Sequence, residues 1–254
     1  MTASVSIGLR GDVDHAVLRA IAPRIEAAGY RTLWLNDNHR GESLAGLAVV
    51  AAVTTRLQLG TGVIALHRLA AEGILGKLAD LPMDRLTLGV GSGGTKGALA
   101  RVDGAVASLR AGTSASVVIG ALGPRMRRLA AERADGVLLN WLTPTAAAGA
   151  TADLRRDAGE RTARSILYAR TIASPVDAAA LDTECARYSA LPTYAANFEL
   201  LGIEAIDTTI RSEDDLVAFR PTVDEVVLRA ITTSGSVAEL ERLVDAYAPA
   251  TSSA

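Results

Sequence analysis

Two glycine-rich segments have the composition of anion-binding loops. Gly89-Val90-Gly91-Ser92-Gly93-Gly94 ends a strand-like apolar run, and Gly120-Ala121-Leu122-Gly123-Pro124 follows a second run and opens a helical segment. Backbone N–H groups of such loops, together with the first turn of the helix, favour a phosphate. The alternative for each is an ordinary structural turn. The first segment also matches the dinucleotide pattern G-x-G-x-x-G, but it belongs to the fourth strand–helix unit and no acidic residue follows about 20 positions later, which disfavours a Rossmann site.

A few polar side chains at other strand ends are able to act on a substrate. His39 follows the strand-like run that ends in Asn36-Asp37-Asn38, where a histidine is able to donate a proton or face a cofactor ring. The simpler interpretation of His39 is a surface residue. Arg170 and Arg229, near the ends of the last two strands, suit an anionic substrate or cofactor tail. Structural ion pairs are the alternative for both arginines.

The elements that position these residues repeat along the chain. Short runs that are apolar without alternation, as in Leu33-Trp34-Leu35, are typical of parallel strands buried on both faces. About eight strand–helix units are predicted, as a closed (β/α)8 TIM barrel requires, in one domain over residues 1–254. The predicted strands are 5–9, 32–36, 57–64, 85–90, 116–120, 136–140, 166–172 and 225–231. Barrel sites lie at the carboxyl ends of the strands. That face is rich in glycine and poor in acid–base pairs, so we expect a bound cofactor to supply the chemistry.

The segment from Ala173 to Val223 interrupts the repeat between the seventh and eighth strands. We expect a helical insertion with helices near 176–191 and 194–201, and a short edge strand over 203–210. Long insertions in compact domains often serve as lids or contact surfaces. A simple cover for the barrel wall is an equal alternative.

Composition excludes several classes of function. The net charge of −2 gives no reason to expect nucleic acid or a membrane surface as a partner, and no apolar segment is long enough to span a bilayer. The single cysteine, Cys185, and the lack of a visible secretory signal favour the cytoplasm. The two lysines, Lys77 and Lys96, lie outside the strands, which disfavours a Schiff-base aldolase. The three histidines form no H-x-H or H-E-x-x-H pair, so no metal site is expected.

Several motifs, in register, resemble the luciferase-like monooxygenase superfamily, and in particular its coenzyme F420-dependent oxidoreductase branch. They cover most of residues 20–145. The matching stretches are Ala27-Ala28-Gly29-Tyr30, Leu33-Trp34-Leu35-Asn36-Asp37-Asn38-His39, Arg56-Leu57-Gln58-Leu59-Gly60-Thr61-Gly62-Val63, Asp84-Arg85-Leu86-Thr87-Leu88-Gly89-Val90-Gly91-Ser92-Gly93, Ile119-Gly120-Ala121-Leu122-Gly123-Pro124 and Ala134-Asp135-Gly136-Val137.

The resemblance implies a barrel that binds F420, or FMN in sister enzymes, at its carboxyl face. It implies a cis peptide bond between Gly62 and Val63, and His39 as the catalytic residue. In sugar-phosphate dehydrogenases of the branch the aspartate and histidine are adjacent, whereas here Asn38 separates them. The expected cofactor-binding residues are Asp37, Thr61, Gly62, Val63, Ser92, Gly93, Ala121, Leu122 and Gly123.

The leading hypothesis from the sequence is an F420-dependent oxidoreductase that moves a hydride between the deazaflavin and a small organic substrate. Arg170 and Arg229 are its expected substrate-binding residues. An FMN-dependent monooxygenase with a partner reductase, and a non-catalytic protein that binds the flavin or deazaflavin, remain alternatives. Because many relatives are dimers, a homodimer is one option for the assembly.

Overall fold

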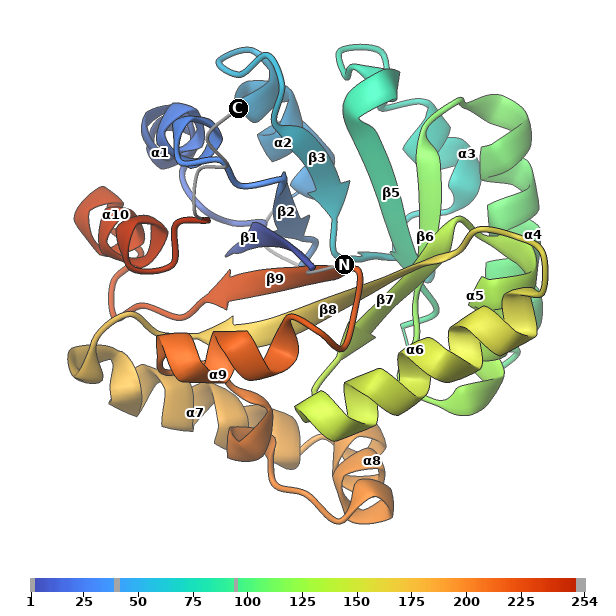
Figure 1. Cartoon of the computed structure of the whole chain (residues 1–254). Helices are drawn as coiled ribbons and strands as arrows, with labels where there is room; N and C mark the ends of the chain where they lie inside the picture. The colour runs from blue at the N-terminus through green and yellow to red at the C-terminus, as the bar shows by residue number, and fades with distance from the viewer. Residues whose placement is uncertain (1–2, 39–41, 94–95, 250–254) are drawn as a thin grey trace.

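The computed structural model describes residues 3–38, 42–93 and 96–249 and forms a closed parallel barrel surrounded by helices (Figure 1). The predicted TIM barrel is confirmed. The strands run in the order β3-β2-β1-β9-β8-β7-β6-β5-β4, and a pairing of β3 with β5 closes the barrel. Their bounds are β1 Ser4–Arg10, β2 Thr32–Asn36, β3 Gln58–Thr61, β4 Ile64–Ala65, β5 Leu86–Gly91, β6 Ser116–Gly120, β7 Gly136–Asn140, β8 Arg164–Thr171 and β9 Glu225–Ala230.

The third predicted strand, residues 57–64, is wrong as a single element. It is divided into β3 and β4 at Gly62-Val63, and the peptide bond between these two residues is cis, as the family resemblance implied. Leu59 pairs with Leu86 across the closing β3–β5 contact, whereas Ile64 of β4 pairs with Val90 further along β5. The break therefore lies at the mouth of the barrel, next to the last residues of β5.

The helices of the barrel cover the outside of the strands (Figure 1). Asp14 caps α1 by accepting a hydrogen bond from the Ala16 N–H, and Thr143 caps α6 in the same way from Ala146. The helix between β4 and β5 is short, with only five residues. The bounds are α1 His15–Ala27, α2 Ser43–Ala51, α3 Ala71–Leu75, α4 Ala98–Gly112, α5 Pro124–Arg133, α6 Pro144–Ala158 and α10 Val237–Ala246. None of these helices, nor any other in the described residues, is long and apolar enough to cross a membrane.

The insertion between β8 and β9 is helical, as predicted, and gathers beside these two strands (Figure 1). It contains α7 Ala178–Ser189, α8 Pro192–Leu201 and α9 Glu213–Phe219. The sequence reading missed α9, although Ser212 accepts a capping hydrogen bond from Asp215. The predicted edge strand over 203–210 is wrong. Residues Ala205–Thr208 form a 3-10 helix, and only a single bridge, between Thr171 and Ile210, joins this segment to the sheet.

The interior of the barrel contains a small core of large side chains, which pack against glycines of the strands. Its buried members are Trp34, Val118, Leu138, Ile166, Tyr168 and Val227. Trp34 lies against Gly60, where a Cβ atom would overlap its indole ring. The much larger core lies outside, between the strands and the surrounding helices. Because the interior core ends at Tyr168, the carboxyl end of the barrel is left open.

Candidate functional site

A cavity of about 720 Å³ opens at the carboxyl ends of the strands. Its walls come from the ends of β2, β5, β6, β7 and β8 and from the insertion. The cavity brings together most of the site residues expected from the sequence: Asp37, Gly62, Val63, Ser92, Gly93, Ala121, Leu122, Gly123 and Arg170. Thr61 and Arg229 do not line it. His39 lies outside the described residues.

Val63 forms the floor of the cavity at the barrel mouth. A Cβ atom on Gly91 would lie 2.9 Å from Val63 Cγ2, and one on Gly120 would lie 3.0 Å from Val63 Cγ1. Both distances are shorter than ordinary carbon–carbon contacts. These two glycines therefore make room for the chain's own valine. From the sequence, the glycines of this face were expected to accommodate a bound cofactor.

Thr61 supports this floor from outside the cavity. Its side chain is fully buried, its hydroxyl donates to the Gly89 carbonyl at 3.0 Å, and it accepts from the Gly89 N–H at 2.8 Å. The hydroxyl thus joins β3 to β5 where the barrel closes, and it is already hydrogen-bonded to protein atoms. This placement differs from the direct cofactor contact expected from the sequence.

Tyr168 lies beneath the floor and carries an unusual hydroxyl. The side chain is 2% exposed, and its hydroxyl has no hydrogen-bond partner among the described residues. A Cβ atom on Gly62 would lie 2.5 Å from this oxygen. Burial raises the pKa of Tyr168 above its usual value, so the hydroxyl stays protonated at neutral pH and is able to donate. Tyr168 was not among the site residues expected from the sequence. The available signal was its spacing, two residues before Arg170 on the same face of the strand.

Arg170 is clamped between the barrel and the insertion. Its guanidinium carbon lies 3.9 Å from the ring centroid of Trp141 and 4.6 Å from that of Tyr188. Its Nε lies 3.6 Å from Glu184 Oε1, and one terminal nitrogen donates to Asn140 Oδ1. Arg170 therefore lines the cavity, and it also holds α7 against the barrel through stacking and charge.

Arg229 is a buried cation beside Arg170. The two residues are paired in register on β9 and β8, and Arg229 is 7% exposed. Its side chain donates to the Ala230 carbonyl, and no carboxylate lies within ion-pair distance of it in the described part of the chain. Burial, and then the charge of Arg170, lower the pKa of Arg229 to about 10. A guanidinium in this environment favours an anion nearby, since burying an uncompensated charge is costly.

The insertion contributes an aromatic wall to the cavity. Tyr188 of α7 and Tyr194 of α8 meet edge to face, with ring centroids 4.8 Å apart. Both rings line the cavity together with residues 191–193 of the connecting turn. The insertion therefore forms a wall of the cavity, a role that differs from those considered from the sequence.

Arg68 and His67, in the loop after β4, line the cavity, and the sequence analysis did not identify either of them. Arg68 forms an ion pair with Asp37, with Nη2 and Oδ2 2.6 Å apart, while Asp37 Oδ1 accepts from the Ser43 N–H at 3.3 Å. His67 packs against Gly93, which has a φ of +73° and no space for a Cβ atom. No sequence motif identifies these residues, because it is the closure of the barrel that places this loop beside the other strand ends.

The end of the cavity away from the insertion meets the N-terminus of α5, and the N-terminus of α4 lines a neighbouring hollow. Gly97 and Gly123 are the N-caps of α4 and α5, and neither helix has an acidic residue in its first turn. Arg101 and Arg125 occupy those turns instead, although the helix dipole favours negative charge there. A second hollow of about 660 Å³ lies between these helices and shares Gly123 and Met126 with the cavity. The arrangement is suited to an anion.

The whole chain matches one protein family. The model of the luciferase-like monooxygenase family matches residues 4–110 and 97–253. The chain therefore belongs to the luciferase-like monooxygenase family, as the sequence motifs indicated.

Solved structures with this fold are named with different cofactors. The chain is 23% identical, over 171 residues, to a 5,10-methylenetetrahydromethanopterin reductase of Archaeoglobus fulgidus, and the match spans 52% of each protein. The coenzyme F420-dependent tetrahydromethanopterin reductase of Methanopyrus kandleri has the same fold, with a TM-score of 0.71, 16% identity and coverage of 96% of this chain and 97% of that one. The oxygenating constituent of 3,6-diketocamphane monooxygenase from Pseudomonas putida, in complex with FMN, has a TM-score of 0.64, 12% identity and coverage of 98% and 99%. These comparisons show the fold, and they leave the cofactor and the substrate open.

Proposed function

We propose that this protein is an F420-dependent oxidoreductase that transfers a hydride between the deazaflavin and a small organic substrate. The observation that carries the proposal is the shape of the cavity. It has an anion-favouring end at the N-terminus of α5, a floor at Val63, and a cationic and aromatic end at Arg170 and Tyr188. A cofactor with a flat ring and a phosphate needs such a slot. The kinship with F420-dependent reductases favours the deazaflavin.

The phosphate of the cofactor would be held where the cavity meets α5. Ser92 and Gly93 follow β5, while Leu122 and Gly123 lead into α5, so both loops present backbone to the same end of the cavity. The first-turn N–H groups of α5 have no acceptor within the helix. A Cβ atom on Gly123 would meet nothing within 4 Å, so space for a ligand remains there.

The ring would lie over the floor formed by Gly62 and Val63, with Ala121 and Asp37 at its sides. Asp37 is oriented by Arg68 and Ser43, and its carboxylate keeps the capacity to accept a further hydrogen bond. When bound, the deazaflavin supplies two electrons as a hydride. The chain supplies alignment and exclusion of water.

The substrate would occupy the end of the cavity beside the insertion. Arg170 would contact an anionic group of the substrate, and Arg229 would add positive potential from behind. The neutral Tyr168 hydroxyl is a donor beneath the floor. His39 remains the proposed acid or base. We expect His39→Ala to lower turnover about tenfold or more without weakening cofactor binding. Near-normal turnover would reject that role.

The first test is a titration of the protein with F420 and, in parallel, with FMN, followed by cofactor fluorescence. The sharpest variants are at Gly123, whose φ of −97° and ψ of 163° suit any residue. Gly123→Asp and Gly123→Asn are both good helix N-caps and differ in charge alone. We expect the aspartate to weaken cofactor binding about tenfold relative to the asparagine, because its charge repels the phosphate.

The outcomes separate the alternatives. Tight binding of F420 with turnover supports hydride transfer. Preference for FMN favours the FMN-dependent monooxygenase instead. Full binding of either cofactor with no turnover across a substrate panel favours the non-catalytic binding protein. Equal affinities of the two Gly123 variants would show that the phosphate lies elsewhere.

A further inference from the structure

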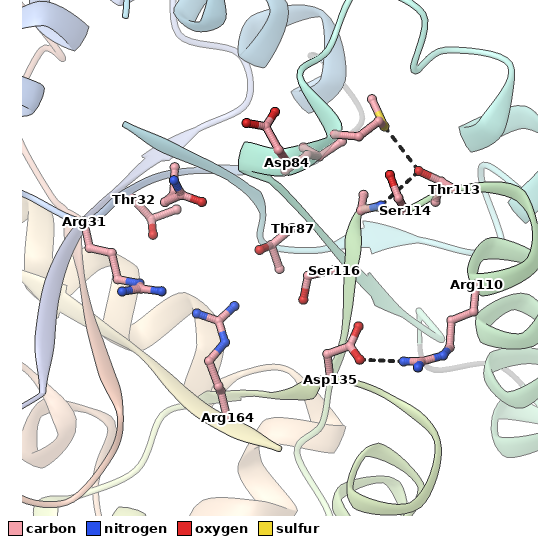
Figure 2. Close-up of a pocket in the computed structure, with 14 residues that line it drawn as sticks. Arg31, Thr32, Asp84, Thr87, Arg110, Thr113, Ser114, Ser116, Asp135 and Arg164 are labelled. Atoms are coloured by element: carbon pink, nitrogen blue, oxygen red, sulfur yellow. Dashed lines mark hydrogen bonds and ion pairs between the residues drawn. The ribbon is translucent and has the colours of Figure 1, made fainter. Parts of the chain in front are cut away.

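The opposite end of the barrel has a second hollow, of about 500 Å³, at the amino ends of the strands (Figure 2). Arg31 precedes β2, and Arg164 is the first residue of β8. Thr32, Thr87 and Ser116 lie at or near the first residues of β2, β5 and β6. The hollow is therefore separated from the candidate active site by the whole interior core of the barrel.

Two arginines in this hollow share one buried carboxylate. Arg31 Nε lies 3.8 Å and Arg164 Nη1 lies 3.6 Å from Glu225 Oε2. Both distances are too long for a hydrogen bond. Glu225 is 1% exposed. Its Oε1 accepts from the Ser6 hydroxyl at 2.7 Å and from Trp34 Nε1 at 2.8 Å, whereas Oε2 has no hydrogen-bond partner in the described part of the chain. The two guanidiniums therefore share one carboxylate at long range, and within the described residues no hydrogen bond uses their side-chain donors.

Hydroxyl groups complete the donor set. Figure 2 shows Arg31 and Arg164 extending toward one another, with Thr87 and Ser116 facing the space beside them. Thr32 and Thr87 are 2% and 7% exposed, and within the described residues no hydrogen bond uses either hydroxyl. The side chains of Arg31 and Arg164 are 49% and 30% exposed, so a ligand from solvent is able to reach them.

Acidic side chains of the hollow do not occupy its centre. Asp135 is engaged by Arg110 at 2.6 Å and by the Val117 N–H at 2.8 Å. Asp84 is exposed and lies across the hollow from Arg164 (Figure 2). The centre is thus lined by two cations and a group of hydroxyl donors.

We propose that this end of the barrel binds a phosphoryl group, as free phosphate or as the phosphate ester of a small molecule. A tetrahedral dianion has enough oxygens to accept from both guanidiniums and from the hydroxyls, and its charge complements two cations that share one distant carboxylate. A planar carboxylate has only two oxygens. The volume of the hollow exceeds that of phosphate and leaves space for an organic substituent. The site is independent of the proposed cofactor site at the other end.

The experiment is a calorimetric titration of the full chain with inorganic phosphate and with glycerol 3-phosphate, in a buffer without other oxyanions. It uses the Gly123→Asp variant as the parent, so that the phosphate seat at α5 does not contribute. We expect saturable binding, and a loss of about tenfold or more in affinity in Arg31→Gln/Arg164→Gln. Arg155→Gln is the matched control. It removes one cation at the same end, where Arg155 pairs with Asp224, and should leave the affinity unchanged.

A second variant keeps the proposal testable if the double variant fails to fold. Glu225→Gln retains the Oε1 acceptor for Ser6 and Trp34 and removes the competing charge, so phosphate should bind several-fold more tightly. Stronger binding of glycerol 3-phosphate identifies an ester as the ligand, and equal binding identifies free phosphate. Absence of saturable binding to the parent, unchanged affinity in the arginine variant, or weaker binding in Glu225→Gln would each overturn the proposal.

Discussion

Replacement of Gly91 by alanine tests the packing of the cavity floor. The new Cβ atom would lie 2.9 Å from Val63 Cγ2, about 0.6 Å or more inside an ordinary carbon–carbon contact. The clash falls on one methyl carbon of Val63, and Val63 Cγ1 lies on the side of Gly120, where an added Cβ atom would be 3.0 Å away. Overpacking of this kind costs about 1–3 kcal/mol. Alanine loses less backbone entropy on folding than glycine does, and this difference offsets about 0.5–1 kcal/mol of the overpacking cost. We expect Gly91→Ala to lower the free energy of unfolding by about 1–2 kcal/mol.

The assay is a double-mutant cycle with Val63→Ala. In that background the methyl carbon that clashes is gone, and the other atom within 4 Å of the new Cβ is Val63 Cβ at 3.9 Å, an ordinary contact. Gly91→Ala should then be neutral or slightly stabilising, which gives a coupling energy of about 1–3 kcal/mol. Denaturant unfolding followed by both circular dichroism and tryptophan fluorescence measures it, with coincident transitions as the check on two-state behaviour.

A control variant separates this clash from a general effect of alanine. A Cβ atom on Gly104, inside α4, meets nothing within 4 Å, so Gly104→Ala should stabilise the chain by about 0.5–1 kcal/mol. An equal cost of Gly91→Ala in the wild-type and Val63→Ala backgrounds would refute the packing argument for the floor.

Three further predictions concern groups around the site. Burial raises the pKa of the Cys185 thiol to about 11, so its labelling by a disulfide reagent at pH 8 should be far slower in the native chain than in denaturant, and equal rates would contradict its burial. The hydrogen bond from Arg10 lowers the pKa of Asp12 to about 2, so its stabilisation is present above about pH 4 and is lost as the pH falls toward 2. Asp12→Asn should therefore cost about 1 kcal/mol at pH 7 and nothing near pH 2, as seen by unfolding at both values, and a cost that does not change with pH would exclude the ion pair as its source. Arg170→Lys retains the charge but loses the planar stack on Trp141, so amide exchange in α7 and α8 should accelerate about tenfold while the strands stay protected, and unchanged exchange would reject the clamp.

Much of the fold follows from local sequence. Buried parallel strands need uniformly apolar runs, and these were sufficient to predict eight strand–helix units and the open carboxyl face. The helix starts at Asp14 and Thr143 follow from local sequence, because each capping side chain bonds a backbone N–H within three residues. The cis peptide bond at Gly62-Val63 was predicted from the family resemblance, since no local propensity indicates it. The short helix α9 was missed, although its capping residue Ser212 is of a typical kind.

The site itself depended on contacts between distant parts of the chain. The sequence alone determined which residues reach the carboxyl ends of the strands, because strand direction and side-chain alternation are local properties. Only the tertiary structure decided what those residues contact. Gly91 faces Val63, Arg170 is enclosed by Trp141 and Tyr188, and Arg31 meets Arg164 over a single carboxylate. Each of these contacts exists because closing the barrel brings strands that are far apart in sequence to the same level, and no periodicity in a single sequence records that register.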